Sequence, residues 1–316
     1  MGTLAVLVAS ACFGTLGPVS RLAYQGGLEP LGFVAWRSGI GGLILAAYLA
    51  IRVSRGGERW VPFRSMPRRT VVSLCVVTTS AVLLNLSLFT AFGRVTVALA
   101  LLGFYTYPVL LALFEAVIRR RSPGRPTLLA LALAVGGMVL VVAGGLGSAG
   151  ALQVDLLGLG LAFFAACSQT VFISVSRDGY GGVPVLQAMT IILVGAAVGF
   201  VVIAFAIGGG GQLAGPLEHP ETIGLLFVGG AIGAGLASAL FLAGIRTIGG
   251  LRTGILALFE PVVGVALAAV LLAEVVAPIQ VLGGGLVLGA AVLLQLVAPN
   301  RGDSSAVPPE AVPGTV

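Results

Sequence analysis

The sequence is poor in charged residues. They make up 9% of its 316 positions and hydrophobic residues make up 58%, whereas an ordinary soluble domain carries about 25% charged residues. The 11 acidic and 17 basic residues cannot supply the polar surface that a water-soluble protein of this length needs. The composition therefore excludes an ordinary soluble domain, and lipid must be the solvent of most of the surface.

The residues that bind metals or form disulfides are also scarce. The chain has one histidine, His219, and three cysteines, Cys12, Cys75 and Cys167, which lie inside apolar runs without CxxC spacing. Neither a zinc site nor a disulfide framework is expected from this pattern, and no other cofactor is predicted. The chain contains no Walker loop, so it is not expected to drive transport by hydrolysing ATP itself.

Lysine is absent, so every basic residue is an arginine and the net charge is +6. The arginines lie mainly between long apolar runs, without the basic face interleaved with exposed aromatic residues that typically binds nucleic acid. Membrane topology and anionic lipid headgroups explain them better. A lipid bilayer is therefore the expected partner, and a nucleic acid is not.

Ten apolar segments are long enough to cross a bilayer. A hydrocarbon core about 30 Å thick needs roughly 20 residues of helix. Turn signals such as Gly26-Gly27 and Ala277-Pro278 separate the segments, and the first segment lacks the charged start of a cleaved signal peptide. The predicted fold is an all-α integral membrane protein with ten transmembrane helices, at 3–24, 30–51, 70–92, 95–118, 126–146, 154–176, 185–207, 222–243, 251–273 and 277–297.

The placement of the arginines predicts the orientation of the chain. If the N-terminus lies in the cytoplasm, most arginines fall in cytoplasmic segments, whereas the opposite loops carry mainly acids. Both termini are then cytoplasmic, and the expected location is the plasma (bacterial inner) membrane. Residues 299–316 are polar and proline-containing, which predicts a short disordered cytoplasmic tail.

Short matches at a nearly constant offset indicate an internal repeat. Leu88-Phe89 matches Leu240-Phe241, and Pro108 matches Pro261. The matches divide the chain into two halves of five spans each. Because five is odd, the second half must insert in the opposite orientation, which produces the inverted repeat of many secondary transporters.

Several short motifs are typical of one transporter family. They are Phe13-Gly14, Val19-Ser20-Arg21, Pro30 with Arg37, Tyr107-Pro108, Leu258-Phe259-Glu260-Pro261 and Ala273-Glu274. On these motifs the chain resembles the EamA-like members of the drug/metabolite transporter superfamily. The resemblance implies two EamA-like five-helix repeats, at 1–148 and 149–298, and transport of amino acids or other small metabolites.

Two charged residues are predicted deep inside spans, where each needs a partner or a water-filled cavity. Glu260 precedes Pro261, which frees a backbone carbonyl one turn earlier. Glu260 suits coupling to a proton or another cation, or a buried structural anchor. Arg37 suits an anionic group in a cavity, or a structural ion pair. Arg37, Pro108 and Pro261 are therefore predicted as gating or structural residues.

Neutral polar residues lie at a similar depth in other spans. Such residues can simply bond neighbouring helices, but the resemblance places the third, fourth, sixth and ninth spans around a central cavity. A pocket of mixed polarity with aromatic walls suits an amino acid or a similar zwitterion. The predicted substrate-binding residues are Asn85, Tyr105, Tyr107, Gln169 and Glu260.

One further acidic residue is placed near the cytoplasmic end of a span. Glu115 precedes Arg119 by four residues, which on a helix predicts a local ion pair.

The leading hypothesis is a secondary transporter that moves a small polar metabolite by alternating access. Export is the expected direction, and protons are the candidate coupling ion. An intramembrane enzyme on lipid-linked substrates would need a nucleophile–base pair or a metal cluster, and a channel would need a filter or a polar ring. The sequence shows neither pattern. An intramembrane enzyme and a channel or scaffold are therefore kept only as alternatives to the transporter hypothesis.

Overall fold

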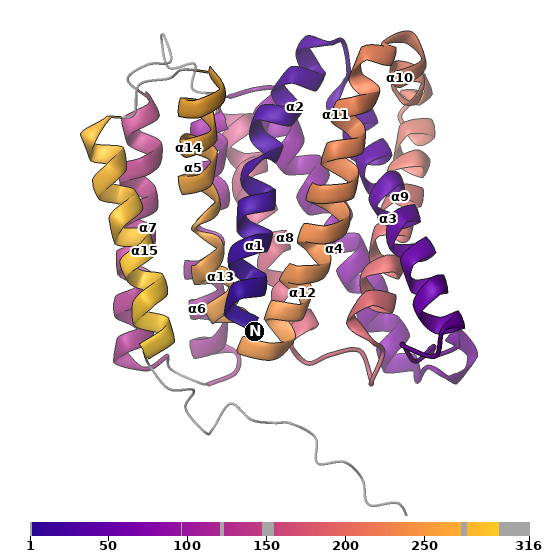
Figure 1. Cartoon of the computed structure of the whole chain (residues 1–316), viewed down its shortest axis with the longest axis horizontal. Helices are drawn as coiled ribbons and strands as arrows, with labels where there is room; N and C mark the ends of the chain where they lie inside the picture. The colour runs from indigo at the N-terminus through magenta and orange to yellow at the C-terminus, as the bar shows by residue number, and fades with distance from the viewer. Residues whose placement is uncertain (1, 96, 121–122, 147–154, 273–276, 297–316) are drawn as a thin grey trace, which may run out of the picture.

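The computed structural model describes residues 2–95, 97–120, 123–146, 155–272 and 277–296 (Figure 1). These residues form helices joined by short loops, and no strand occurs among them. The junction between the two predicted repeats and the predicted tail at 299–316 lie outside the described residues.

Helices occupy all ten predicted spans wherever the structure describes them. In the first half they are α1 (Gly2–Gly14), α2 (Leu16–Gln25), α3 (Pro30–Ser54), α4 (Arg68–Phe92), α5 (Val97–Phe104), α6 (Tyr107–Val117) and α7 (Arg125–Leu146). In the second half they are α8 (Leu156–Arg177), α9 (Val185–Ala206), α11 (Ile223–Val228), the π-helix η4 (Gly229–Leu236), α12 (Ala237–Ile248), α13 (Gly250–Ala257), α14 (Glu260–Leu272) and α15 (Pro278–Leu296). Short helices in the loops are η1 (Phe63–Ser65), η2 (Gly210–Ala214), α10 (Gly215–Glu218) and η3 (Pro220–Thr222).

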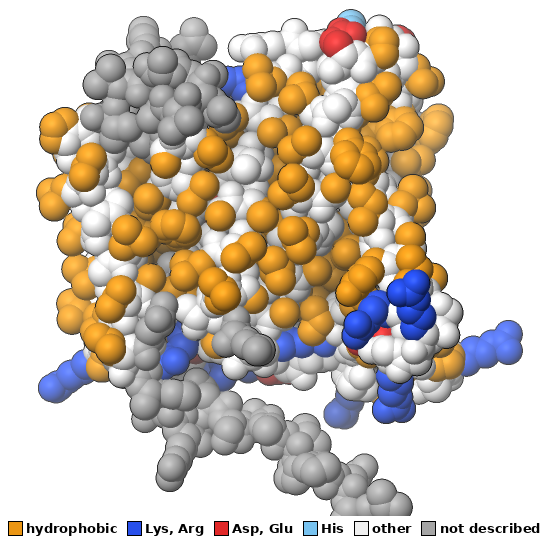
Figure 2. Space-filling view, viewed as in Figure 1, with side chains coloured by type: hydrophobic (Ala, Val, Ile, Leu, Met, Phe, Trp, Pro, Cys, Tyr) orange, Lys and Arg blue, Asp and Glu red, His pale blue; other side chains and the backbone are white. Residues whose placement is uncertain are grey.

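Eight helical segments among the described residues are long and apolar enough to cross a membrane. α15 is counted as a shorter apolar helix, and the α13–α14 segment is interrupted at its centre. The protein is therefore an all-helical membrane protein that crosses the bilayer several times, and the tenfold crossing stays a prediction. Figure 2 shows hydrophobic side chains across the middle of the visible face, with arginines gathered at the edge where α1 begins. We call that edge the N-terminal face and the other edge the opposite face.

Local chemistry explains where several helices begin. Pro30 stands at the start of α3, where a residue without an N–H group leaves no hydrogen bond unmade. Asp155 precedes α8, and its carboxylate accepts a hydrogen bond of 2.9 Å from the backbone N–H of Leu157. Gly249 has a φ of 86°, which lets a single residue connect α12 to α13.

Two spans are interrupted inside the bundle. α5 gives way to α6 at Thr106, and α13 gives way to α14 at Phe259. Pro108 and Pro261 occupy the second position of the helices that follow. A proline nitrogen cannot donate to the carbonyl four residues earlier, so Phe104 and Ala257 each lose their usual partner.

The first helix of each half packs mainly against the other half. α1 contacts α12, α13 and α14, whereas α8 contacts α4, α5 and α6. α3 lies along α9, and α7 lies along α15 at one side of the bundle (Figure 1). Each half therefore depends on the other for its core, and the two halves share one interior.

Glycine is required where α3 crosses η4. A Cβ atom on Gly41 would lie 2.7 Å from the carbonyl oxygen of Gly230 and 2.9 Å from the Cβ of Ala234. A Cβ atom on Gly230 would in turn lie 2.7 Å from the Cβ of Ile40. Small residues let membrane helices approach this closely. The contact positions the second turn of α3, which carries Arg37.

We expect Gly41→Ala to destabilise the protein because two backbones would have to separate. Overpacking of this kind costs about 1–3 kcal/mol. The measurement is the thermal unfolding midpoint of the purified protein in detergent. Gly39→Ala is the matched control, since the nearest atom to its new Cβ, on Ala197, would lie 4.0 Å away. Equal midpoints for the two variants would contradict the close crossing.

Candidate functional site

A cavity of about 350 Å³ lies between the two halves. Its lining reaches from Tyr107 and Glu260, at the two helix interruptions, to Arg21 and Phe92, near the ends of α2 and α4. Phe104 and Ala257, whose carbonyls lack the proline donors, are both among the lining residues. Both interruptions therefore lie at the cavity, and non-helical backbone at membrane depth is tolerated where it is buried in protein or lines a water-filled space.

The structure brings the predicted substrate-binding residues together. Asn85, Tyr105, Tyr107, Gln169 and Glu260 all line the cavity. Arg37 and Pro261 line it as well, whereas Pro108 is buried in α6 and is not among the lining residues.

Arg37 is the charged group on one side of the cavity. Its side chain is 5% exposed, and its Nη2 atom donates a hydrogen bond to Oδ1 of Asn85. The guanidinium lies over the ring of Phe89, with 4.8 Å between Cζ and the ring centroid. Its Nε atom has no hydrogen-bond partner, and no carboxylate lies within ion-pair distance among the described residues. The positive charge is thus held in place but not neutralised by an adjacent acid.

Asn85 fixes the position of this arginine. Its Nδ2 atom donates a 2.7 Å hydrogen bond to the carbonyl oxygen of Ala81, one turn earlier in α4. That bond orients the amide so that its oxygen faces Arg37. α4 therefore supplies both the acceptor and, through Phe89, the aromatic face for a cation carried by α3.

Glu260 is the acidic group of the cavity. It is the first residue of α14, and Tyr105, Tyr107 and Arg37 all lie within electrostatic range of its carboxyl group. Tyr105 is fully buried, and its hydroxyl makes no hydrogen bond of normal geometry with any described residue. Tyr107 differs, because its hydroxyl donates a 3.2 Å hydrogen bond to the carbonyl oxygen of Gly254 in α13. One tyrosine therefore joins the two interrupted helices, while the hydroxyl of the other lies beside the acid.

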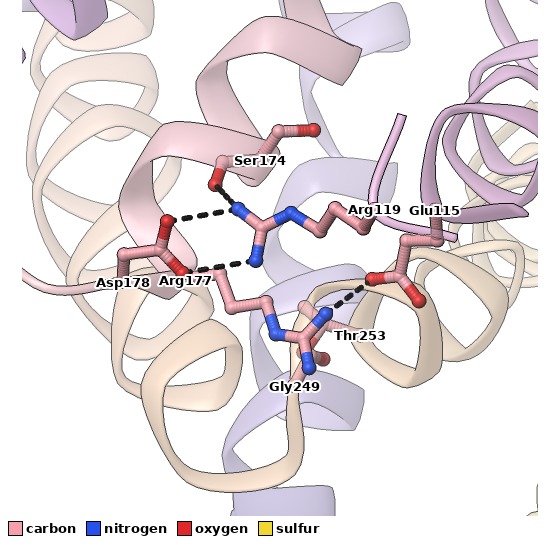
Figure 3. Close-up of polar contacts among 7 residues, drawn as sticks. All are labelled: Glu115, Arg119, Ser174, Arg177, Asp178, Gly249 and Thr253. Atoms are coloured by element: carbon pink, nitrogen blue, oxygen red, sulfur yellow. Dashed lines mark hydrogen bonds and ion pairs between the residues drawn. The ribbon is translucent and has the colours of Figure 1, made fainter. Parts of the chain in front are cut away.

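Ion pairs join the two halves at the N-terminal face (Figure 3). Arg119, just after α6, binds both carboxylate oxygens of Asp178, at 3.0 and 2.8 Å, and donates to the carbonyl oxygen of Ser174 at 3.0 Å. Arg177 donates to Glu115 at 2.7 Å, and both side chains are largely buried. The spacing predicted a pair between Glu115 and Arg119, whereas the structure pairs Arg119 with Asp178 and Glu115 with Arg177, both at the end of α8.

A second group of contacts covers the same face. Arg246 donates a 2.7 Å hydrogen bond to the carbonyl oxygen of Val183 and lies over the ring of Tyr180, 4.7 Å from its centroid. The Tyr180 hydroxyl is 2.5 Å from Oγ of Ser176. Because these residues connect α12, the end of α8 and the loop before α9, they close the N-terminal end of the bundle below the cavity.

Comparison with known proteins decides the family. The model of the EamA-like transporter family matches residues 1–143 and 156–296 of this chain. The chain belongs to the EamA-like transporter family. Matches to 28 chains of solved structures support the fold; one of them, a protein crystal structure, shares 19% sequence identity at a TM-score of 0.71, over 94% of this chain and 99% of that one. No protein among the curated sequences matches.

The two segments that the EamA-like family model matches correspond to the two halves of the bundle. The family consists of membrane transporters rather than enzymes, which implies interaction with a small-molecule solute. Among the described residues, no three histidine, cysteine or acidic side chains lie close enough together to hold a metal ion.

Sequence reasoning missed several lining residues of this EamA-like protein. Ser38 and Ser238 are single hydroxyls in apolar helices, and nothing in their spacing marks them. Gln280 had a usable signal, because a glutamine three residues into a helix can cap its start. Its Oε1 atom accepts from the N–H of Ala277 at 2.8 Å, and its Nε2 atom donates to Val141 at 3.2 Å. Gln280 is therefore already committed to structural bonds.

We expect Asn85→Leu to destabilise the protein, because Arg37 would lose its acceptor while staying buried. A hydrogen bond to a charged group contributes about 1.5–3 kcal/mol. The thermal unfolding midpoint in detergent measures the loss. Asn85→Asp keeps an acceptor for the guanidinium and should retain more stability than Asn85→Leu. Equal loss in both variants would show that Asn85 does not support the arginine.

Proposed function

We propose that the protein is a secondary transporter that carries a small zwitterionic metabolite, such as an amino acid, by alternating access. The observation that carries the proposal is a cavity between the two halves, lined by a buried cation, Arg37, and a half-buried acid, Glu260. Its volume of about 350 Å³ lies at the lower end of the usual range for small-molecule sites.

The two charges favour a solute that carries both signs. Arg37 lacks an ion-pair partner among the described residues, so a solute carboxylate is a suitable counterion. Glu260, with the hydroxyl of Tyr105 beside it, suits an ammonium group or a proton. The lining phenylalanines and leucines then accommodate an apolar side chain. Asn85, Tyr105, Tyr107, Gln169 and Glu260 are proposed as the binding residues.

The arrangement of the helices supports alternating access. Ten spans in two inverted repeats, at 1–148 and 149–298, would place the cavity on a pseudo-two-fold axis. The pairings of α1 with the second half and of α8 with the first half have this symmetry. In this structure ion pairs between α6 and α8 close the N-terminal face, while the cavity lining extends toward the opposite face. Breaking those pairs would open the other side.

The arginines support an orientation of the protein in the membrane. Because they gather at the N-terminal face, that face is proposed to be cytoplasmic, with both termini inside and the protein in the plasma (bacterial inner) membrane. The conformation described here would then be open to the outside, the state in which an exporter releases its solute. Arg37, Pro108 and Pro261 are proposed to support the gate between the two states.

Flux into proteoliposomes tests the function. We expect the purified protein to exchange at least one radiolabelled amino acid faster than empty liposomes do. Arg37→Gln should weaken apparent affinity for that amino acid roughly tenfold to a hundredfold, the worth of a charged hydrogen bond, but should change transport of the decarboxylated amine much less. Arg94→Gln is the control, because Arg94 pairs with Asp155 on the exposed opposite face. Flux equal to empty liposomes across a broad metabolite panel would contradict the proposal.

A separate prediction concerns coupling at Glu260. If this carboxyl carries the proton, Glu260→Gln should abolish uptake or efflux driven by a pH gradient and leave solute exchange in place, because a glutamine has no titratable proton. Both modes are measured on the same proteoliposome preparation. A pH-gradient dependence that is unchanged in the variant would exclude Glu260 as the coupling residue.

A further inference from the structure

The loop between α3 and α4 carries unusually dense, unpaired positive charge. Its single acid, Glu58, lies 3.9 Å from Arg52. The remaining arginines are exposed, and no ion-pair partner is found for them in the part of the chain that the structure describes. We call them the loop arginines: Arg55, Arg59 and Arg64 in the loop, and Arg68 and Arg69 at the start of α4.

Two aromatic side chains lie among the loop arginines. Trp60 is 44% exposed and Phe63 is 54% exposed. The loop folds back on the bundle, but it leaves both of these large aromatic side chains at the surface. α3 and α4 are both candidate membrane spans, so the loop that joins them must lie at the membrane surface. The amphipathic indole of Trp60 is favoured at that depth, between headgroups and acyl chains, and Phe63 adds an apolar ring near it.

The loop is a fixed platform because its backbone is anchored. Gln187, fully buried at the start of α9, accepts a 3.0 Å hydrogen bond from the N–H of Val61 and donates one of 2.6 Å to the Val61 carbonyl. Met66 is also buried, and Oγ of Ser65 donates to the carbonyl oxygen of Pro62 at 2.8 Å. These contacts hold the backbone at the middle of the loop, on which Trp60, Phe63 and the arginines beside them are carried.

We propose that residues 55–69 form a binding site for the headgroups of anionic phospholipids. Guanidinium groups bind phosphate oxygens in pairs of hydrogen bonds, and an anionic headgroup adds a net charge that the loop arginines can neutralise. Trp60 and Phe63 pack against the glycerol and upper acyl carbons. The site lies outside the solute cavity and does not depend on what the cavity transports.

The competing explanation is that the loop arginines only orient the chain during insertion. Orientation requires positive charge on one side of the membrane, but it requires neither the anchored backbone nor the exposed aromatic pair. The two explanations differ in what they expect of lipid composition around Trp60. A headgroup site enriches anionic lipid there above its bulk fraction, whereas orientation alone does not.

Fluorescence quenching of Trp60 tests the site in the full-length, reconstituted protein. The chain has two tryptophans, so Trp36→Phe leaves Trp60 as the only reporter. The protein is placed in phosphatidylcholine vesicles that contain an increasing fraction of brominated phosphatidylglycerol or, in a parallel series, brominated phosphatidylcholine. We expect phosphatidylglycerol to quench Trp60 at a clearly lower mole fraction. Equal quenching by the two lipids would overturn the proposal.

Variants of the loop assign the preference to charge. Arg59→Gln with Arg64→Gln should weaken the preference roughly fivefold per arginine, and Arg59→Lys with Arg64→Lys should retain most of it. Arg125→Gln is the matched control, because Arg125 is an exposed arginine at the start of α7, outside this loop. A preference that is unchanged in the double glutamine variant would overturn the site.

Two further measurements separate the lipid from other sources of the signal. In the Trp60→Phe variant, Trp36 reports on its own place in α3, where its indole N–H donates to the carbonyl oxygen of Leu213 in η2, and we expect no preference there. Added inorganic phosphate should leave the preference of Trp60 intact. Loss of the preference on adding phosphate would assign the loop to free phosphate instead.

Discussion

A helix that is interrupted inside a membrane leaves backbone groups that cannot face lipid. In this protein two helices are interrupted, at Thr106 and at Phe259, and both interruptions lie at one cavity. The carbonyls that the prolines leave without donors belong to lining residues of that cavity. The need to solvate this backbone explains why a polar space exists at the centre of so apolar a chain, and the charged residues occupy that same space.

The charged residues of the cavity depend on close packing elsewhere. Arg37 can remain buried because α4 provides Asn85 as an acceptor and Phe89 as an aromatic face. Its helix is positioned by the crossing with η4, where Gly41 meets Gly230. A π-helix at this crossing is notable because such helices are frequent at functional sites. Polar and packing contacts together hold the cation at the cavity wall.

The two ends of the bundle are held by different kinds of contact. At the N-terminal face, largely buried or bidentate ion pairs connect α6 to α8, and Arg246 binds the loop before α9. At the opposite face, Arg94 and Asp155 form an exposed pair, which solvent and salt screen. Ion pairs join both ends of α8 to the first half. A change in the relative position of the two halves would therefore alter the contacts of α8.

Much of the site was predictable because span boundaries set the depth of each residue. Asn85, Tyr105, Tyr107, Gln169 and Glu260 were chosen by depth and polarity, and all five line the cavity. Contacts between residues on different helices were harder to predict in this way. The i,i+4 rule sees only one helix, so it suggested Arg119 for Glu115 and had no means of finding Arg177 on α8.

By itself, the sequence determined that this protein resides in a membrane, that it is helical and that it is built from two EamA-like halves, because hydrophobic runs and proline positions are local properties of a chain. Only the tertiary structure decided that Arg37 donates to Asn85 with no acid at ion-pair distance among the described residues, that Gln187 anchors the α3–α4 loop, and that Glu115 pairs with Arg177 on α8. These features depend on helix rotation and on contacts between segments far apart in the chain, and the apolar periodicity of a lipid-facing helix carries little information about either.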